Sequence, residues 1–246
     1  MLKIKKISKN FGGVKAVNNC SFKVEPNTIT ALIGPNGAGK STLFNLISSV
    51  IKPDTGKIFF DQKDITNSLP EEVSNAGISR LFQKARLFEN LTVEDNLLLA
   101  LDNTDTKFWF NLFSKTPKQT DKIQKVKKIL EMLGMKKTKN VLAKDLSYGQ
   151  KRLIELGRTI LNPHSFLMLD EPVAGVSPKL RTKISEILLD LKKQGETILL
   201  IEHDMAFTLG IADRVIVLDQ GSVLTEGTPK QIKNNKQVLK AYLGEG

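Results

Sequence analysis

The chain contains a glycine-rich loop that is followed directly by lysine and serine. Residues 34–41 fit the pattern Gly-x-x-x-x-Gly-Lys-Ser/Thr at every fixed position. In such loops the backbone N–H groups turn toward phosphate oxygens, and the N-terminus of the next helix adds positive potential. We therefore predict a loop that binds nucleotide phosphates. Its contact residues would be Gly34, Pro35, Asn36, Gly37, Ala38, Gly39, Lys40, Ser41 and Thr42.

The flanks of this loop support the same interpretation. Residues 28–33 form an apolar run typical of a strand, and residues 42–47 form an amphipathic stretch typical of a helix. In a strand–loop–helix unit, Lys40 would reach the β- and γ-phosphates and Ser41 would bind Mg²⁺. The alternative is an ordinary glycine-rich turn, which these flanks disfavour.

Acidic residues follow a second apolar run. Residues 166–170 are apolar up to Asp170, and Glu171 comes next. At the end of a strand, Asp170 would hold Mg²⁺ and Glu171 would polarise the attacking water as the catalytic base. The apolar run 197–201 precedes His203, which we expect to hydrogen-bond the γ-phosphate at the same sheet edge. A lone histidine is more often structural, so that alternative stays open.

The composition indicates a globular α/β protein. The chain has 246 residues, of which 40% are hydrophobic, and no apolar run approaches the roughly 20 residues of a membrane span. The segment 1–7 is too short and too charged for a signal peptide, and its alternation of apolar residues with lysine predicts an edge strand. The single cysteine, Cys20, excludes an internal disulfide and indicates a reducing compartment.

The net charge of +11 is unevenly distributed. Residues 107–144 hold eleven lysines, and their only acids are Asp121 and Glu131. Such a block could face nucleic acid, anionic lipid or an acidic partner, or it could be a solvated lysine face.

Apolar runs outline a core that comes from both ends of the chain. We expect strands near 2–7, 20–25, 28–33, 57–60, 78–82, 166–170, 197–201 and 214–219, and a helix over 178–194. Continuous apolar runs predict strands that are buried on both faces of a mostly parallel sheet. The predicted fold is an α/β P-loop ATPase core (about 1–92 and 161–246) with an antiparallel N-terminal β portion and a helical subdomain (about 93–160).

One further motif makes the chain resemble the ATP-binding cassette (ABC) ATPases. Residues 146–150, Leu-Ser-Tyr-Gly-Gln, resemble the family's signature motif, and Ser147 has the residue type and position of a helix N-cap. The resemblance implies a single cassette of nearly the whole chain, with ATP and Mg²⁺ as ligands. It implies that Ser147, Gly149 and Gln150 contact the γ-phosphate bound on a second ATP-binding subunit, a copy or a paralogue, in a head-to-tail dimer.

The resemblance implies two more site residues. Phe11 would stack on adenine, and Gln83 would join the Mg²⁺ or water shell and sense the membrane partner. Two positions depart from the family pattern: Tyr148 stands where glycine is common, and the loop 174–178 lacks the aspartate of many relatives. The missing aspartate weakens the expectation that the two sites of a dimer are coupled through that loop.

Details of sequence point to one branch of this family. The signature, residues 201–205 and the ending 227–245 resemble ATP-binding subunits of bacterial branched-chain amino-acid importers. This resemblance implies transmembrane permease subunits and, indirectly, a periplasmic binding protein as partners, at the cytoplasmic face of the membrane. Urea uptake and lipopolysaccharide export are alternatives, because cassettes do not touch the cargo. A soluble nucleic-acid-associated cassette is a third, although no nucleic-acid partner is expected.

A loop after the fifth expected strand offers a surface for the permease. Residues 80–91 include Leu87 and Phe88 beside two cations, a composition that favours a partner with an apolar anchor and a charged rim. The alternative is that both apolar side chains pack into the domain.

Overall fold

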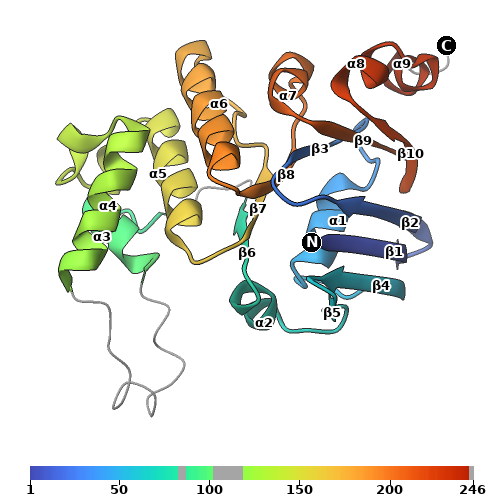
Figure 1. The fold of residues 1–246 in the computed structure, drawn as a ribbon, viewed down its shortest axis with the longest axis horizontal. Helices are drawn as coiled ribbons and strands as arrows, with labels where there is room; N and C mark the ends of the chain where they lie inside the picture. Colours follow the sequence, from blue (N-terminus) through green and yellow to red (C-terminus); the bar gives the residue numbers. More distant parts are fainter. Residues whose placement is uncertain (83–86, 102–118, 244–246) are drawn as a thin grey trace. The chain divides into compact units, whose positions relative to one another are not determined.

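The structure is a computed structural model that describes residues 1–82, 87–101 and 119–243, drawn in Figure 1. The described strands are β1 (Leu2–Phe11), β2 (Val14–Val24), β3 (Ile29–Ile33), β4 (Thr55–Phe60), β5 (Lys63–Asp64), β6 (Ile78–Leu81), β7 (Phe166–Asp170), β8 (Thr197–Ile201), β9 (Arg214–Asp219) and β10 (Ser222–Gly227). The described α-helices are α1 (Lys40–Ile47), α2 (Pro70–Asn75), α3 (Val93–Leu99), α4 (Gln119–Leu133), α5 (Tyr148–Leu161), α6 (Pro178–Lys193), α7 (Met205–Ile211), α8 (Pro229–Lys233) and α9 (Lys236–Leu243).

The chain forms two compact units. The first comprises Met1–Arg80, His164–Glu171 and Leu188–Gly246, and the second comprises Leu81–Pro163 and Pro172–Ile187. Among the described residues, no helix is long and apolar enough to cross a membrane.

An antiparallel sheet opens the first unit. Within the described residues its strand order is β2-β1-β4-β5, so β1 has a neighbour on each side. The prediction of an edge strand at the N-terminus is therefore wrong. Apolar residues alternate with lysines because Leu2, Ile4 and Ile7 are buried while the intervening lysines face solvent. Between Ile4 and Ile7 the two-residue alternation is interrupted, because the pairing of β1 with β2 shifts in register there.

The second sheet carries the strands that were predicted as buried runs. In the described chain its order is β10-β9-β3-β8-β7-β6, with β3 parallel to β8 and β9, and β7 parallel to β8. All five residues of β3, β7 and β8 are buried, as continuous apolar sequences predict. Because β7 and β8 run in parallel, Asp170 and Ile201 pair at one sheet edge, where both strands end.

One hydrophobic core joins the two sheets of the first unit. Residues of α1, including Leu43 and Phe44, share it with inward-facing residues of β1, β2 and β4 and with residues of β7–β9. The rings of Phe60 (β4) and Phe166 (β7) meet edge to face, with centroids 5.8 Å apart. The core therefore anchors α1, and with it the loop that precedes α1.

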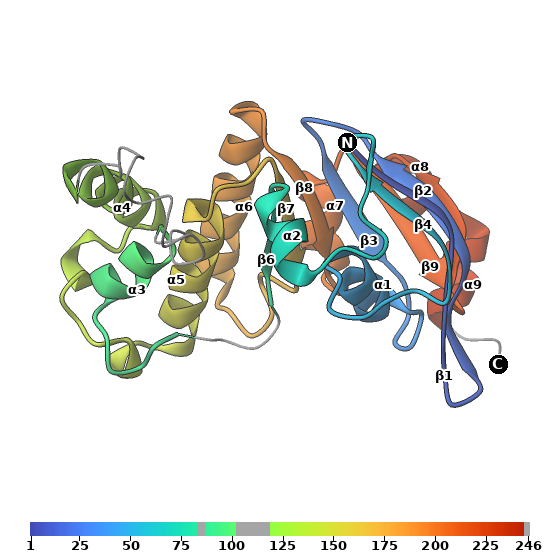
Figure 2. The ribbon, with the colours of Figure 1, turned by 90° about the horizontal axis from the view of Figure 1, so that it is seen from below.

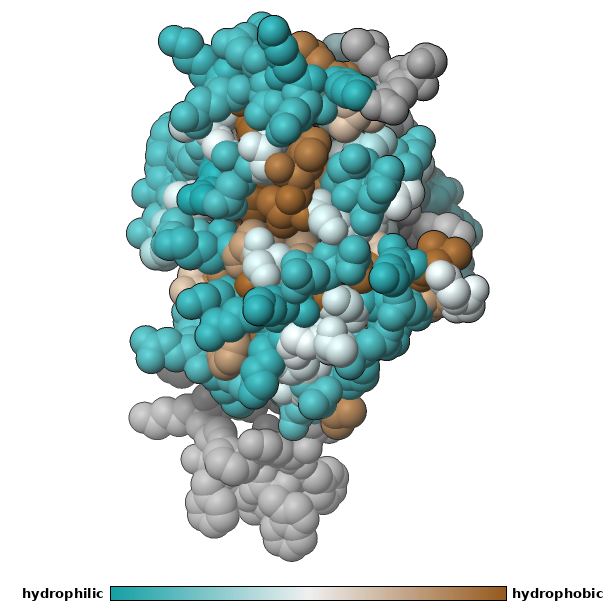
Figure 3. All heavy atoms as spheres, turned by 90° about the vertical axis from the view of Figure 1, so that its right-hand side faces the viewer, coloured by the Kyte–Doolittle hydropathy of each residue, from teal (hydrophilic) through white to brown (hydrophobic). Residues whose placement is uncertain are grey.

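On the face in Figure 3, hydrophilic residues predominate around a small apolar area.

The second unit contains α3, α4, α5 and the first part of α6. Helices α3, α4 and α5 lie side by side in Figures 1 and 2. Gly157 in α5 makes this packing possible, because a Cβ atom there would lie 2.8 Å from Leu133 and 3.2 Å from Leu97. The close packing holds α5 at a fixed position relative to α4, and so it holds the signature residues at the start of α5.

Candidate functional site

The phosphate loop lies between β3 and α1, as predicted. Gly34 and Gly39 are required there by close backbone contacts: a Cβ atom at Gly34 would lie 2.2 Å from the oxygen of Leu218, and one at Gly39 would lie 2.3 Å from the oxygen of Ala16. Gly39 also has a φ of 96°, in the left-handed region. The loop shape therefore depends on neighbouring strands as well as on its own sequence.

Lys40 is the buried cation of this loop. Its Nζ donates hydrogen bonds to the carbonyl oxygens of Gly34 (2.7 Å) and Pro35 (2.9 Å). Burial lowers the pKa of Lys40, while the charges of Glu171 and Asp170 act in the opposite direction. The Lys40 ammonium group is thus held by the carbonyl oxygens of the same loop that is predicted to bind phosphate.

Three predicted residues meet at the ends of β7 and β8. His203 Nε2 lies 2.9 Å from Oε1 of Glu171, and the Glu171 N–H donates to the oxygen of Ile201 at 2.9 Å. The φ of Glu171 is 50°, a left-handed conformation that is uncommon for a residue with a side chain. Asp170 precedes Glu171 and is 4% exposed. The strand ends therefore place a histidine beside a carboxylate, the pairing that proton-transfer chemistry uses.

Arg80 is a site residue that the sequence interpretation did not assign. Its guanidinium lies 3.2 Å from Oδ2 of Asp170 and donates to Asn45 Oδ1 (2.8 Å) and Ser48 Oγ (2.7 Å). Both charged side chains are more than nine-tenths buried. Arg80 thus connects Asp170 to α1. Arg80 belongs to no motif and lies in a strand of four residues, so nothing local in the sequence pointed to this role.

The phosphate loop opens on a cleft of about 690 Å³ in the first unit. Glu171 and His203 line this cleft together with Lys40, Ser41 and other loop residues. Residues Val14, Lys15, Ala16, Asn18 and Gln220 also line it, and none of them was predicted. The first four of these belong to β2 and Gln220 lies in the turn between β9 and β10, and neither segment carries a motif of its own. The cleft volume is in the range of small-molecule sites.

The remaining predicted nucleotide contacts are Phe11 and Gln83. Phe11 ends β1, is 47% exposed, and has the Lys9 ammonium 5.6 Å from its ring centroid. It does not line the cleft, although Val14 and Lys15 of the same hairpin do. Nearly half of the Phe11 side chain is exposed, and the adenine contact stays a prediction. Gln83 lies outside the described residues.

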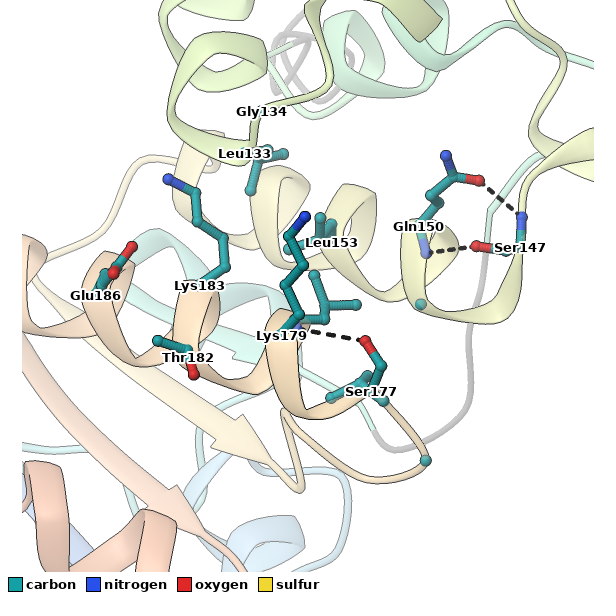
Figure 4. A pocket seen from close by; sticks show the side chains of 14 residues that line it. Leu133, Gly134, Ser147, Gln150, Leu153, Ser177, Lys179, Thr182, Lys183 and Glu186 are labelled. Carbon is teal, nitrogen blue, oxygen red and sulfur yellow. Dashed lines mark hydrogen bonds between the residues drawn. The ribbon is translucent and has the colours of Figure 1, made fainter.

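The signature residues lie in the second unit, at the N-terminus of α5. Ser147 accepts a hydrogen bond from the Gln150 N–H (3.3 Å), and the Gln150 side chain accepts one from the Ser147 N–H (2.9 Å). This reciprocal capping box fixes the first turn of α5, and Figure 4 shows both bonds. Ser147, Gly149 and Gln150 line a pocket of about 860 Å³ within this unit. The N-terminus of an α-helix carries positive potential and is suited to binding an anion.

The fold and the first-unit cleft define a P-loop nucleotide-binding protein. Comparison with known families shows which class it is. Residues 17–174 match the family described as ABC transporter, and the chain belongs to that family. Residues 222–246 match a second family, described as branched-chain amino acid ATP-binding cassette transporter.

Relatives match over nearly the whole chain. The high-affinity branched-chain amino acid transport ATP-binding protein LivG of Escherichia coli is 39% identical over 250 residues, covering 100% of this chain and 98% of the relative. A probable LivG of Archaeoglobus fulgidus is 38% identical over 245 residues, covering 99% and 95%.

Solved structures agree with this result. A nucleotide-free ATP-binding cassette from an ABC transporter superposes with a TM-score of 0.86 at 37% identity, covering 100% of this chain and 99% of that one. The ADP conformation of an ABC transporter cassette gives a TM-score of 0.87 at 37% identity with the same coverage. The predicted mixed fold, with an antiparallel N-terminal sheet and a parallel core sheet, is confirmed.

Proposed function

We propose that this chain is the ATP-hydrolysing subunit of an importer for branched-chain amino acids. The observation that carries the proposal is the His203–Glu171 pair beside the phosphate loop, in a chain that matches branched-chain amino acid transport ATP-binding proteins over its full length. That similarity favours amino acids over urea or lipopolysaccharide as cargo. It also disfavours a soluble nucleic-acid-associated role.

ATP would be held by the residues of the phosphate loop. Residues 36–42 line the cleft, and Lys40 would exchange its bonds to two loop carbonyls for bonds to the phosphates. The exchange is favourable because the phosphate oxygens carry negative charge, whereas the two carbonyl oxygens are neutral.

The residues present fit a magnesium ion. Hydroxyl and carboxylate oxygens are ligands that Mg²⁺ prefers, and Ser41 and Asp170 supply them, with Gln83 as a further candidate. In the described chain no three His, Cys, Asp or Glu residues cluster as a self-sufficient metal site. This is consistent with an ion that is shared with substrate phosphates. Bound Mg²⁺ would neutralise charge on the transferred phosphoryl group.

Hydrolysis would depend on Glu171 and His203. The Glu171 carboxylate would accept a hydrogen bond from the attacking water and orient it toward phosphorus. His203 holds that carboxylate through the 2.9 Å contact, and its half-exposed ring could also reach the γ-phosphate. The left-handed backbone at Glu171 turns the chain just after the strand, and the Glu171 side chain lines the same cleft as the phosphate loop.

A second ATP-binding subunit would complete the site. Ser147, Gly149 and Gln150 present the N-terminus of α5 in their own unit, where they would contact the γ-phosphate of the nucleotide that is held by the other subunit. We propose a head-to-tail dimer with a copy or a paralogue, closed by two ATP molecules.

Transmembrane permease subunits would receive the mechanical work at the cytoplasmic face of the membrane, with a periplasmic binding protein as an indirect partner.

Phe88 is 52% exposed, and the guanidinium of Arg158 lies 5.4 Å from its ring centroid. Its backbone is anchored by Asn96, which exchanges hydrogen bonds of 2.9 and 3.0 Å with it. An apolar ring on an anchored backbone, beside a cation, supports a permease contact.

The Glu171→Gln variant tests the proposal. It should bind ATP with unchanged affinity and hydrolyse it about 10²-fold or more slowly, because a general base is lost. Cells that depend on this transporter should lose uptake of radiolabelled leucine, isoleucine and valine when they carry Glu171→Gln. Normal ATP turnover would remove Glu171 from its role, and normal uptake in cells that lack this chain would refute the cargo.

A further inference from the structure

The pocket at the start of α5 has a second wall, which is formed by α6. Figure 4 shows this pocket between the end of α4, the first turn of α5 and the first turns of α6. The two helix starts are in direct contact, since a Cβ atom at Gly149 would lie 2.7 Å from Cδ2 of Leu180. An anion at the start of α5 would therefore lie near the side chains that flank Leu180.

Two lysines project from this second wall. Lys179 and Lys183 are four residues apart in α6, so they share one helix face, and both line the pocket. Figure 4 shows both side chains extending from α6 in the same direction, on the side of Leu133 and Leu153. Glu186 is the acid among the lining residues, so the wall carries a net positive charge.

The surroundings of the two lysines strengthen their attraction for an anion. Leu133, Leu153, Val176 and Leu180 provide an apolar floor, and low-dielectric walls concentrate the field of nearby charges. The pocket is larger than a single phosphate group requires, and it is large enough for a nucleotide. A charged pair above an apolar floor fits a ligand with several negative charges and a flat apolar part.

We propose that Lys179 and Lys183 bind the nucleotide held by the second ATP-binding subunit, and so extend the contact that Ser147 and Gly149 begin. This inference rests on the proposed head-to-tail dimer. Neither lysine belongs to a motif, and their role is to hold the partner's ATP, not to act on water. The first-unit cleft is formed by other residues, so these lysines leave the affinity of the isolated chain for nucleotide unchanged.

The test compares two measurements on the Lys179→Gln/Lys183→Gln variant. In the transporter purified through a tag on this chain, the KM for ATP should rise at least about tenfold, with kcat less affected. The affinity of the isolated chain for a fluorescent ATP analogue should equal that of the wild type. The Lys179→Arg/Lys183→Arg variant should restore the KM, because the charge is retained.

Lys192→Gln/Lys193→Gln is the matched control. It removes the same charge from the last turn of the same helix, where both lysines have acidic partners of their own and neither lines the pocket. Its KM should stay at the wild-type value, and equal melting temperatures of the isolated chains would show that every variant folds.

The outcomes separate this inference from the function on which it rests. An unchanged KM in Lys179→Gln/Lys183→Gln, or an equal loss of affinity in the isolated chain, would overturn the role of the lysines. Ser147→Arg places a bulky side chain at the α5 start and should abolish turnover in the transporter. If Ser147→Arg has no effect, the head-to-tail dimer itself is wrong. If Ser147→Arg abolishes turnover but the lysine variant behaves as the wild type, only the lysine inference fails.

Discussion

The ring of Tyr148 lies against the turn at Gly175. A Cβ atom at Gly175 would be 3.1 Å from Cε1 of Tyr148, and Gly175 has a φ of 67°, so both the contact and the backbone require glycine there. Tyr148 is the first residue of α5, and Gly175 lies in the loop that follows Glu171. Tyr148, which departs from the commonest signature, thus meets the loop that lacks the usual aspartate, within one unit. The contact joins the start of α5 to the loop after Glu171, the proposed catalytic base.

Tyr148→Ala should weaken this connection. We expect kcat of the assembled transporter to fall about fivefold or more, the scale of a modest coupling energy between sites. Nucleotide affinity of the isolated chain should not change. Tyr148→Phe keeps the ring and serves as the control in steady-state ATPase assays. Equal turnover of Tyr148→Ala and Tyr148→Phe would show that the contact has no part in coupling.

His203→Ala should separate catalysis from folding. The histidine is 46% exposed in its contact with Glu171, and exposed ion pairs add little stability. The melting temperature should therefore stay near the wild-type value, while kcat falls about 10²-fold because the carboxylate and water lose their orientation. Calorimetry and a phosphate-release assay measure the two quantities. A variant that melts early but turns over normally would support a structural histidine instead.

Arg80→Leu should destabilise the first unit. It leaves the buried Asp170 carboxylate without its guanidinium partner, and breaking a buried ion pair in this way costs about 3–5 kcal/mol. Urea denaturation would measure the loss. Arg80→Leu with Asp170→Leu removes both charges and should recover much of the stability without recovering activity. No recovery in the double variant would show that Arg80 acts through Asn45 and Ser48.

Phe11→Ala tests the adenine contact. Stacking on an aromatic ring is worth about 1–3 kcal/mol and does not depend on the base, so the KM for ATP and for GTP should rise by similar factors. Isothermal titration with both nucleotides checks this expectation. If neither affinity changes, the exposed ring at the end of β1 serves another contact.

Cys20 should make the protein less stable in strong alkali. Burial raises the pKa of its thiol from 9.0 to about 12, so the native state keeps the proton that the unfolded state loses above pH 9. Stability therefore falls as pH rises through this window, by up to about 1.4 kcal/mol per pH unit from this group. Urea titrations at pH 8 and 10 should show a smaller decline for Cys20→Ala. The native thiol should also resist iodoacetamide at pH 8.

Much of the core could be predicted because a strand that is buried on both faces of a sheet has a continuous apolar sequence. β7, β8 and β9 have the predicted bounds, and the α6 helix ends one residue early. The phosphate loop and the residues after β7 and β8 were predicted because a motif or a strand end positions them. β10 and the helices after it have mixed, half-exposed sequences and were missed.

Partners that are distant in sequence were harder to predict. Arg80 meets Asp170 across ninety positions of the chain, and only the adjacency of strands brings them together. Lys179 and Lys183 have the composition of any solvated helix face, and the packing of Leu180 on Gly149 gives them a pocket. The lysine-rich sequence before residue 119 and Gln83 lie outside the described residues.

We expect the backbone contacts around the phosphate loop to speed nucleotide entry. Gly221 donates its N–H to the oxygen of Ala38 (3.2 Å), while the Leu218 carbonyl lies against Gly34, so the β9–β10 hairpin braces the loop at both ends. A braced loop is already close to its bound shape and loses little conformational freedom on association. The main rearrangement left is the release of Lys40 from two carbonyls. We expect preorganisation of this kind to let the cassette reload quickly after each hydrolysis, and it comes from the β9–β10 hairpin.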